Sequence, residues 1–364
     1  MTESNFLDDD IYLHLSHRPR YILNGVISID DSTKPASTII QRECRSSLGQ
    51  LDNLPLEILH ESLTYLDLQS LWRLSRVSLR GKAIVESLRE HRNLVTSAGY
   101  TFEILNRARI LGLHSVTTLY AALYSKRCIS CDAYGPFLLL LSAERCCFGC
   151  LAVNQSLWMI SLPLVGECFG LTKQQLRALP IMRSIPGKYR VAHSVSHQRS
   201  IRLTTVKAAK ELALKVHGSL EALATKFPLD ARNIATVNKL DTLTWYRQAE
   251  LRPLSHDPLT IKDVGIRPRD NFCGMGAIPF PSLLKNGTEQ GLWCRGCEFT
   301  YKTGVAIEEM DPSTLSGLVP QGCDADQFLL RIQYRAWSKA DFLQHAKHCH
   351  STAAVISQKW IGST

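Results

Sequence analysis

Two cysteine pairs place the strongest constraint on how this chain can fold. Cys128 and Cys131 form one C-x2-C turn, Cys147 and Cys150 form a second, and fifteen residues separate the two turns. A C-x2-C turn holds two thiolates near the edge distance of a tetrahedron, and its backbone N–H groups can hydrogen-bond the sulfurs. The spacing therefore predicts a closed four-cysteine zinc site, with the intervening chain folded back on itself. Cys146 is an alternative ligand to Cys147, and buried free thiols or a redox pair are the alternatives to zinc.

Four protein ligands leave no open position for water, so we expect a structural site and not a catalytic one. The chain has twelve cysteines, and its first ten residues lack the positive start and apolar core of a secretory signal. Thiols stay reduced in the cytoplasm and the nucleus, and we expect this protein in one or both of these compartments. Metal binding is then a better explanation of the cysteines than a disulfide framework.

A third C-x2-C turn, Cys294 to Cys297, lacks a partner turn of the same kind. We expect its partners to come from the last predicted helix, which Ser338 caps, because His345 and Cys349 lie four residues apart on one helical face. This predicts a second structural zinc site with three cysteines and one histidine. Gly296 would give the turn its backbone freedom. The competing ligand positions are Cys273, Cys323, His348 and His350.

Residues 51–94 have apolar positions at helical spacing in three short blocks. The first block runs from Leu54 to Leu66 with Pro55 at its first helical position. The second runs from Asp67, the expected N-cap, to Val77. The third lies around Ala83–Leu94. A cluster of about forty residues is too small to bury all its apolar side chains, so its surface gains by docking on a partner.

The same forty residues resemble the F-box. The resemblance rests on the Leu-Pro-x-Glu-Ile opening at 54–58, the Leu-Asp-Leu at 66–68, and the Leu-x-x-Leu-Ser-Arg-Val-Ser close at 71–78. It implies a three-helix unit that binds the small adaptor subunit of cullin-based ubiquitin ligases, and through it the cullin scaffold. It also implies which residues make or support the adaptor contacts: Leu54, Pro55, Ile58, Leu63 and Leu71. No aromatic residue follows the close, which leaves the boundary of the third helix open.

Beyond this unit, the order of several motifs is similar to that of zinc-binding F-box proteins common in filamentous fungi. The motifs are Cys128–Cys131, Gly135–Phe137, Glu144–Cys150, Met182–Gly187, Val216–Ser219 and Trp293–Cys297. The likeness runs from about 50 to 350. It implies a receptor for a protein substrate and does not name that substrate.

The sequence divides into four expected regions. Residues 1–48 read as a flexible or loosely docked extension, 49–95 as the F-box, 96–190 as a helical segment with the four-cysteine site, and 191–364 as a basic α+β region with the second site. The four cysteines enclose one apolar strand at Phe137–Leu141. We therefore expect an α+β fold that is predominantly helical, with a three-helix F-box followed by a body that holds two zinc knuckles.

The net charge of +9 is concentrated in residues 181–220, which carry eight Lys or Arg and one Glu. Clustered cations favour nucleic acid, and a zinc-dependent nucleic-acid-binding regulator is the alternative function. Thr205–Lys226, however, reads as one amphipathic helix whose outer face, including Lys207 and Lys210, is merely solvated. Neither cysteine set has the spacing of major-groove zinc fingers. Nucleic acid is the weaker prediction.

Residues 146–166 carry no charge, but their apolar core is shorter than a membrane span, so we expect a buried helix there and no membrane association. The sequence has no Walker-type loop, nucleophile elbow or H-E-x-x-H motif. We expect a non-catalytic adaptor subunit of a ubiquitin ligase.

Overall fold

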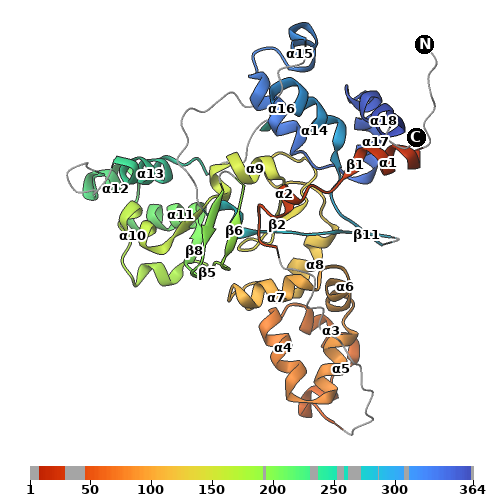
Figure 1. Cartoon of the computed structure of the whole chain (residues 1–364). Coiled ribbons are helices and arrows are strands. Elements are labelled where there is room, and N and C mark those ends of the chain that lie inside the picture. The colour runs from red at the N-terminus through yellow and green to blue at the C-terminus, as the bar shows by residue number, and fades with distance from the viewer. Residues whose placement is uncertain are drawn as a thin grey trace.

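The computed structural model describes residues 8–28, 46–191, 194–229, 237–251, 258–260, 272–285, 287–306 and 311–361. Figure 1 shows a helical lobe (α3 to α7) at one end of the molecule, a mixed central body, and a terminal lobe at the other end. The terminal lobe comprises α1, α14 and α16 to α18. It brings the two ends of the described chain together.

The helical lobe begins after a short 3-10 turn at Gly49–Asn53. Its helices are α3 (Leu56–Thr64), α4 (Leu68–Val77), α5 (Leu79–Ser87), α6 (Arg89–Ala98) and α7 (Tyr100–Arg107).

The helix boundaries follow local capping chemistry. Asp67 caps α4 as expected, since its carboxylate accepts the N–H of Ser70 at 2.9 Å. Pro55 precedes α3 as its N-cap residue and is not its first helical residue. The block predicted around Ala83–Leu94 spans the end of α5 and the start of α6, because the backbone of Leu88 leaves the helical conformation between them while its side chain is 1% exposed.

One apolar core joins the helical lobe to the central body. Leu59 and Leu71 of the lobe belong to the same buried cluster as Leu119 of α8 (Val116–Tyr124) and as Leu138 and Ile278 of the central sheet. Each fully buried leucine or isoleucine contributes roughly 1.5–3 kcal/mol. The lobe is thus fixed to the body by packing and not by a linker.

Two three-stranded antiparallel sheets form the centre of the body. The first has the order β3-β2-β9 and the second the order β4-β8-β5. Their strands are β2 (Phe137–Leu139), β3 (Arg145–Cys146), β9 (Ala277–Pro279), β4 (Met159–Ser161), β8 (Arg202–Thr205) and β5 (Met182–Arg183). The first sheet contains the apolar strand expected within 137–141.

Two hairpins and a group of helices complete the body. The hairpins pair β6 (Gly187–Tyr189) with β7 (Val195–His197), and β10 (Ser282–Leu284) with β11 (Gly287–Glu289). The helices are α9 (Phe148–Val153), α10 (Leu162–Phe169), α11 (Val206–His217), α12 (Leu220–Lys226) and α13 (Val237–Gln248). The helix expected at 205–226 breaks into α11 and α12 at Gly218, whose φ of +85° is a glycine conformation.

The terminal lobe combines the first and last described segments. Its helices are α1 (Asp8–Leu15), α14 (Arg295–Tyr301), α16 (Ala325–Gln333), α17 (Lys339–His348) and α18 (Thr352–Ile361). Strand β1 (Ser16–His17) pairs antiparallel with β12 (Trp293–Cys294), and α1 contacts both α17 and α18. The short helices α2 (Arg20–Leu23) and α15 (Pro312–Leu318) lie nearby in Figure 1.

The expectation of a flexible or loosely docked extension at 1–48 does not hold for residues 8–28. The side chains of Ile11, Leu15 and Ile22 are buried, and β1 pairs with β12 in an antiparallel sheet. The reason is packing: α1 is one wall of the apolar cluster that surrounds Cys294 and Cys297. Residues 1–7 and 29–45 of that predicted extension lie outside the described residues.

The fold is α+β and predominantly helical, as the sequence predicted. The uncharged stretch 146–166 does not form one helix, because it is divided among β3, α9, a 3-10 turn, β4 and the start of α10. Within the described residues, no helix combines the length and the apolar character that crossing a membrane requires.

Candidate metal centres and docking surface

The first cysteine set gathers in a buried pocket beside the central sheet. Cys128 and Cys131 lie in the loop after α8, while Cys147 and Cys150 lie at the start of α9. Their four sulfurs are all within 4.8 Å of one another, and the Cys131 and Cys147 sulfurs are 3.7 Å apart. A tetrahedral ion with metal–sulfur bonds of about 2.3 Å needs sulfur–sulfur edges of about 3.8 Å. The site fits a metal ion and not a disulfide, whose bond is about 2.05 Å.

Local backbone geometry shapes both turns of this set. The Ser130 N–H donates to the Cys128 sulfur at 3.4 Å, and the Cys150 N–H donates to the Cys147 sulfur at 3.3 Å. These are the backbone contacts that the spacing predicted. They stabilise the thiolate form of a sulfur, which is the form that binds metal.

Cys146 was the alternative to Cys147, and the structure separates the two residues. Cys146 lies in β3 opposite Phe137 and is fully buried, but its sulfur does not join the set. Burial raises the pKa of the Cys146 thiol well above its usual value. Cys146 is therefore a neutral core residue.

Charge repulsion limits how the first set can ionise by itself. Hydrogen bonds from the neighbouring thiols lower the pKa of Cys128, and the same contacts with Cys128 raise the pKa of Cys147 and of Cys150. The pKa of Cys131 is lowered as well, so two of the thiols ionise readily while Cys147 and Cys150 resist ionisation. A bound cation removes that conflict, since thiolates ligate metal in their deprotonated form.

The second set joins α14 to the end of α17. The Cys297 sulfur lies 3.2 Å from Nε2 of His345 and 3.9 Å from the Cys349 sulfur, and the Cys294 and Cys349 sulfurs are 3.7 Å apart. All four ligand atoms lie within 4.8 Å of one another. The competitors Cys273, Cys323, His348 and His350 are not part of this group.

Packing around the second set orients its ligands. The Trp337 ring stacks on His345 with centroids 4.4 Å apart and an interplanar angle of 11°. A Cβ on Gly296 would lie 2.7 Å from the Cys349 sulfur and 3.3 Å from the Cys294 sulfur. Gly296 is therefore needed for space, whereas the sequence suggested backbone freedom, and its φ is not positive. No sequence pattern predicted the contact between Trp337 and His345, because stacking depends on the orientation of α17.

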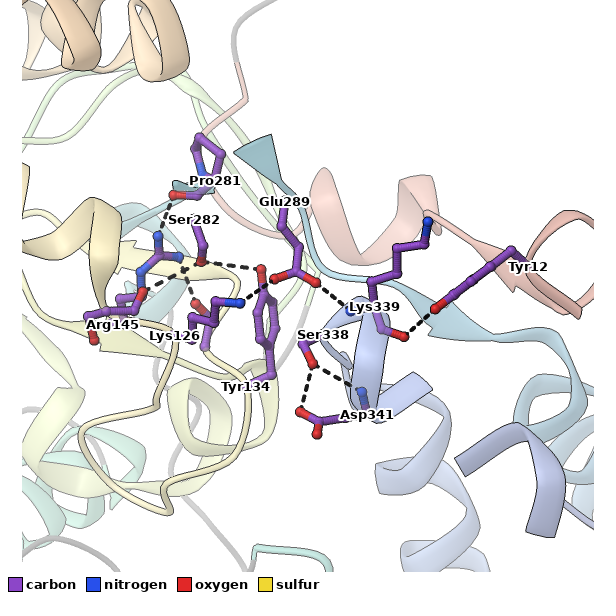
Figure 2. A network of polar contacts seen from close by, with 12 residues as sticks. Tyr12, Lys126, Tyr134, Arg145, Pro281, Ser282, Glu289, Ser338, Lys339 and Asp341 are labelled. Carbon is purple, nitrogen blue, oxygen red and sulfur yellow. Dashed lines mark hydrogen bonds and ion pairs between the residues drawn. The ribbon is translucent and has the colours of Figure 1, made fainter. Parts of the chain in front are cut away.

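A polar network connects Lys126, in the loop after α8, to the terminal lobe (Figure 2). Glu289 is buried on β11, where its carboxylate pairs with Lys126 Nζ at 3.0 Å and accepts the backbone N–H of Lys339 at the start of α17. The Tyr12 hydroxyl donates to the Lys339 carbonyl at 2.6 Å. Segments that are distant in sequence thus meet at one helix N-terminus.

Arg145 supports the same region from within the core. Its guanidinium is buried and donates to the carbonyls of Ala122, Gly135, Phe280 and Pro281. Burial lowers the pKa of Arg145 to about 10. These bonds connect α8, the segment between the two cysteine turns, and the link between β9 and β10. No spacing in the sequence predicted this role.

The residues predicted to make or support adaptor contacts separate into two groups. Leu54 is 42% exposed and Ile58 49% exposed, and Pro55 is exposed beside them. Leu63 is 5% exposed and Leu71 1% exposed, so both lie in the core beneath. The surface also exposes apolar side chains that the sequence analysis did not single out: Leu51, Leu56, Tyr65, Trp72, Val77 and Leu79.

The basic segment is less uniform than its sequence suggests. Lys210 is 6% exposed and its Nζ donates to the Ala249 carbonyl, so it does not face solvent as expected. Arg183 and Arg202 are exposed partners on neighbouring strands. One of the eight cations on which the nucleic-acid alternative rests is thus used inside the fold.

Comparison with known proteins finds one match. Residues 51–93 match the family model of the F-box domain, which covers α3, α4, α5 and the first half of α6. Neither the curated proteins nor the solved structures contain a match to the chain. The exposed apolar surface described above lies within an F-box domain.

Proposed function

We propose that this chain, which carries an F-box domain at residues 51–93, is a substrate-receptor subunit of a cullin-based ubiquitin ligase. The observation that carries the proposal is the F-box match combined with an uncovered apolar surface on α3. In F-box proteins this unit binds the small adaptor subunit of the ligase. The chain would contribute binding and placement, and the chemistry of ubiquitin transfer would belong to other subunits.

The surface is suited to docking on an adaptor. Leu54, Leu56 and Ile58 are each more than 40% exposed and lie within five residues at the start of α3. Contiguous exposed apolar side chains favour a protein interface. Leu63 and Leu71 pack beneath them and hold the helices in place. We expect the exposed residues to contact the adaptor and the buried ones to support it.

Both metal sets fit zinc as a structural ion. Four cysteines, or three cysteines and one histidine, in tetrahedral arrangement are ligand sets typical of structural zinc. Each set fills all four positions from the protein, so neither offers a place for a reacting water. This supports a non-catalytic role, in the cytoplasm or nucleus, where thiols remain available to bind metal.

The continuous core gives the receptor a fixed geometry. Because Leu71 of the helical lobe and Leu138 of the central sheet belong to one buried cluster, a substrate on the body would stay in a constant position relative to the adaptor. A rigid connection of this kind is useful for presenting a bound protein to the rest of a ligase.

The test is binding of the purified full chain to the adaptor subunit. Leu54→Ala combined with Ile58→Ala should weaken binding at least about tenfold, since buried apolar anchors dominate interface energies. Leu13→Ala is the matched control, because Leu13 is also exposed but lies on α1 in the terminal lobe. The proposal fails if the wild-type chain does not bind the adaptor, or if the double variant binds as well as the control.

A further inference from the structure

A cavity of about 560 Å³ lies where the N-terminal segment, the helical lobe and the central body meet. Its walls come from the α2 region, from Tyr100 at the start of α7, and from the loops around β9, β10 and β12. Small-molecule and peptide pockets commonly have volumes of roughly 300–1,000 Å³. The cavity lies apart from both metal sets and from Leu54 and Ile58, none of which lines it.

Apolar groups form about half of the walls. Pro136, Pro279, Pro281, Phe280 and Trp293 line the cavity, and the last two side chains are almost completely buried. The walls are also held in place: the Tyr100 hydroxyl donates to the Pro279 carbonyl, and Trp293 Nε1 donates to the Tyr334 carbonyl at 3.0 Å. A preformed apolar wall of this kind favours binding, because little order must be created when a ligand enters.

The polar side chains around the cavity all share the ability to donate hydrogen bonds. They are Arg18, Asn24, Ser28, Ser97 and Gln290. Within the described residues, none of these five side chains has a hydrogen bond or an ion pair, and no carboxylate lines the cavity. Desolvation is the largest influence on Arg18 and lowers its pKa, while part of the side chain stays exposed. Among the described residues, the lining thus combines one cation, with no carboxylate beside it, and apolar groups that are held in place.

A second cavity has a lining with a different balance of charges. It has about 400 Å³ and lies beside the first metal centre, with Lys207, Glu144 and Glu211 among its lining residues. Among the described lining residues, its one cation is accompanied by two carboxylates, whereas Arg18 is accompanied by none. Of the two, only the cavity at Arg18 has a charge complementary to an anionic ligand.

We propose that the Arg18 cavity binds the C-terminal residue of a protein chain that ends in an apolar side chain. The inference rests on the proposed function and names the class of substrate feature that the receptor would capture. A terminal residue carries a carboxylate and a side chain on the same Cα, which matches one guanidinium set against apolar walls in a single cavity. Arg18 pairs with the carboxylate, and the neighbouring amides and hydroxyls donate to it. The side chain packs on Leu23, Tyr100 and Pro279, the half-buried apolar residues of the lining.

The test uses pools of fluorescent, acetylated pentapeptides whose last three positions are randomised without Asp or Glu. One pool has a free C-terminal carboxylate and a second is amidated; a third is amidated and ends in Glu. Retention of each pool on the immobilised full chain is measured by fluorescence and mass spectrometry. We expect the free-carboxylate pool to be retained, with apolar last residues enriched, and the two amidated pools to pass through.

Two arginine variants test whether the peptides bind in the Arg18 cavity. Arg18→Ala should weaken retention of the free-carboxylate peptides by roughly tenfold to a hundredfold, the usual effect of losing a charge-assisted pair. Arg20→Ala is the matched control, because Arg20 is exposed, lies two residues away and does not line the cavity. Both variants remove one positive charge. The proposal is overturned if no free-carboxylate peptide is retained, if an amidated pool is retained equally well, or if the two variants behave alike.

Adaptor binding measured on the same preparations separates this inference from the proposed function. Retained adaptor binding without peptide retention overturns only the C-terminus proposal. Peptide retention without adaptor binding overturns only the ubiquitin-ligase role. Adaptor binding and metal content also report whether Arg18→Ala is folded, and the amidated arm on the wild-type chain tests the proposal without any variant.

Discussion

The two candidate metal centres share the C-x2-C turn, but their ligands come from very different lengths of chain. In the first, a fifteen-residue hairpin separates Cys131 from Cys147, and all four ligands lie within 128–150. In the second, Cys297 and His345 are separated by 47 residues, and the surrounding apolar cluster includes Ile11 and Leu15 of α1. The first centre is a local unit inside the body, whereas the second ties together both described ends of the chain.

This difference predicts unequal consequences when a ligand is lost. The first set borders the cluster that contains Phe137, Phe148 and Trp293, which lies at the middle of the molecule. The second set lies in a small cluster at the periphery. We therefore expect failure of the first centre to affect the whole body and failure of the second to stay within the terminal lobe.

The largest effect should come from Cys150→Ser. Loss of the ion from the first centre should lower the free energy of unfolding by several kcal/mol, up to roughly 10 kcal/mol, because structural zinc contributes on that scale. Elemental analysis should show one zinc per chain in place of two, and thermal melting should lose its main transition. Cys146→Ser is the control, since this buried thiol lies outside the set and should leave two zinc ions bound. Equal metal content in the two variants would contradict the assignment.

His345→Ala should have a smaller and localised effect. The second ion should be lost, and hydrogen exchange should rise in α1, α17 and α18 while adaptor binding stays unchanged, because the F-box lies at the other end of the molecule. His348→Ala replaces a neighbouring histidine outside the set and should retain both ions. Faster exchange in the central sheet of His345→Ala would show that the two centres are not independent.

Gly149→Ala and Gly296→Ala compare the two turns directly, because each glycine directly precedes the second cysteine of its pair. A Cβ at 296 would meet the Cys349 sulfur at 2.7 Å, whereas a Cβ at 149 meets nothing closer than 3.5 Å. Gly296→Ala should weaken zinc binding at the second centre by roughly tenfold, or more than 1 kcal/mol. Gly149→Ala should be neutral or slightly stabilising, since alanine favours a helix by about 0.5–1 kcal/mol. Competition with a chelator measures both affinities.

The smallest effect should come from Tyr12→Phe. It removes the hydroxyl that donates to the Lys339 carbonyl, a contact worth about 0.5–1.5 kcal/mol. Exchange protection in α1 should fall by up to about tenfold with both zinc ions still bound. An unchanged exchange rate would show that apolar packing of Ile11 and Leu15 is enough to hold α1.

Sequence reasoning succeeded where the relevant partners are close along the chain or share a helix face. It predicted the His345 and Cys349 pair and the Asp67 cap, which depend on spacings of four residues or fewer, and the first cysteine set, whose two turns are only fifteen residues apart. The F-box pattern at 54–78 is similarly local, and the family match at 51–93 confirms it.

It failed where a distant segment decides the outcome. The docking of residues 8–28 depends on β12 and α17, nearly 300 residues away, and no local pattern reveals such a partner. Lys210 is buried because the carbonyl of Ala249, just beyond α13, accepts its ammonium. Periodicity also could not tell that Leu56 stays at the surface while Leu63 enters the core, since short helices leave the width of the buried face undetermined.

Because α1 packs against helices from the far end of the chain, it cannot complete its packing until those helices have been synthesised. Residues 8–17 leave the ribosome early, but Trp293, Cys294 and the helices that cover Ile11 and Leu15 follow nearly 300 residues later. At roughly 5–20 residues per second, this apolar segment waits on the order of 15–60 seconds for its partners. During that interval the nascent chain exposes a binding site for chaperones. A truncated chain that stops before the second candidate metal centre would keep that apolar segment exposed, and chaperones could continue to bind it.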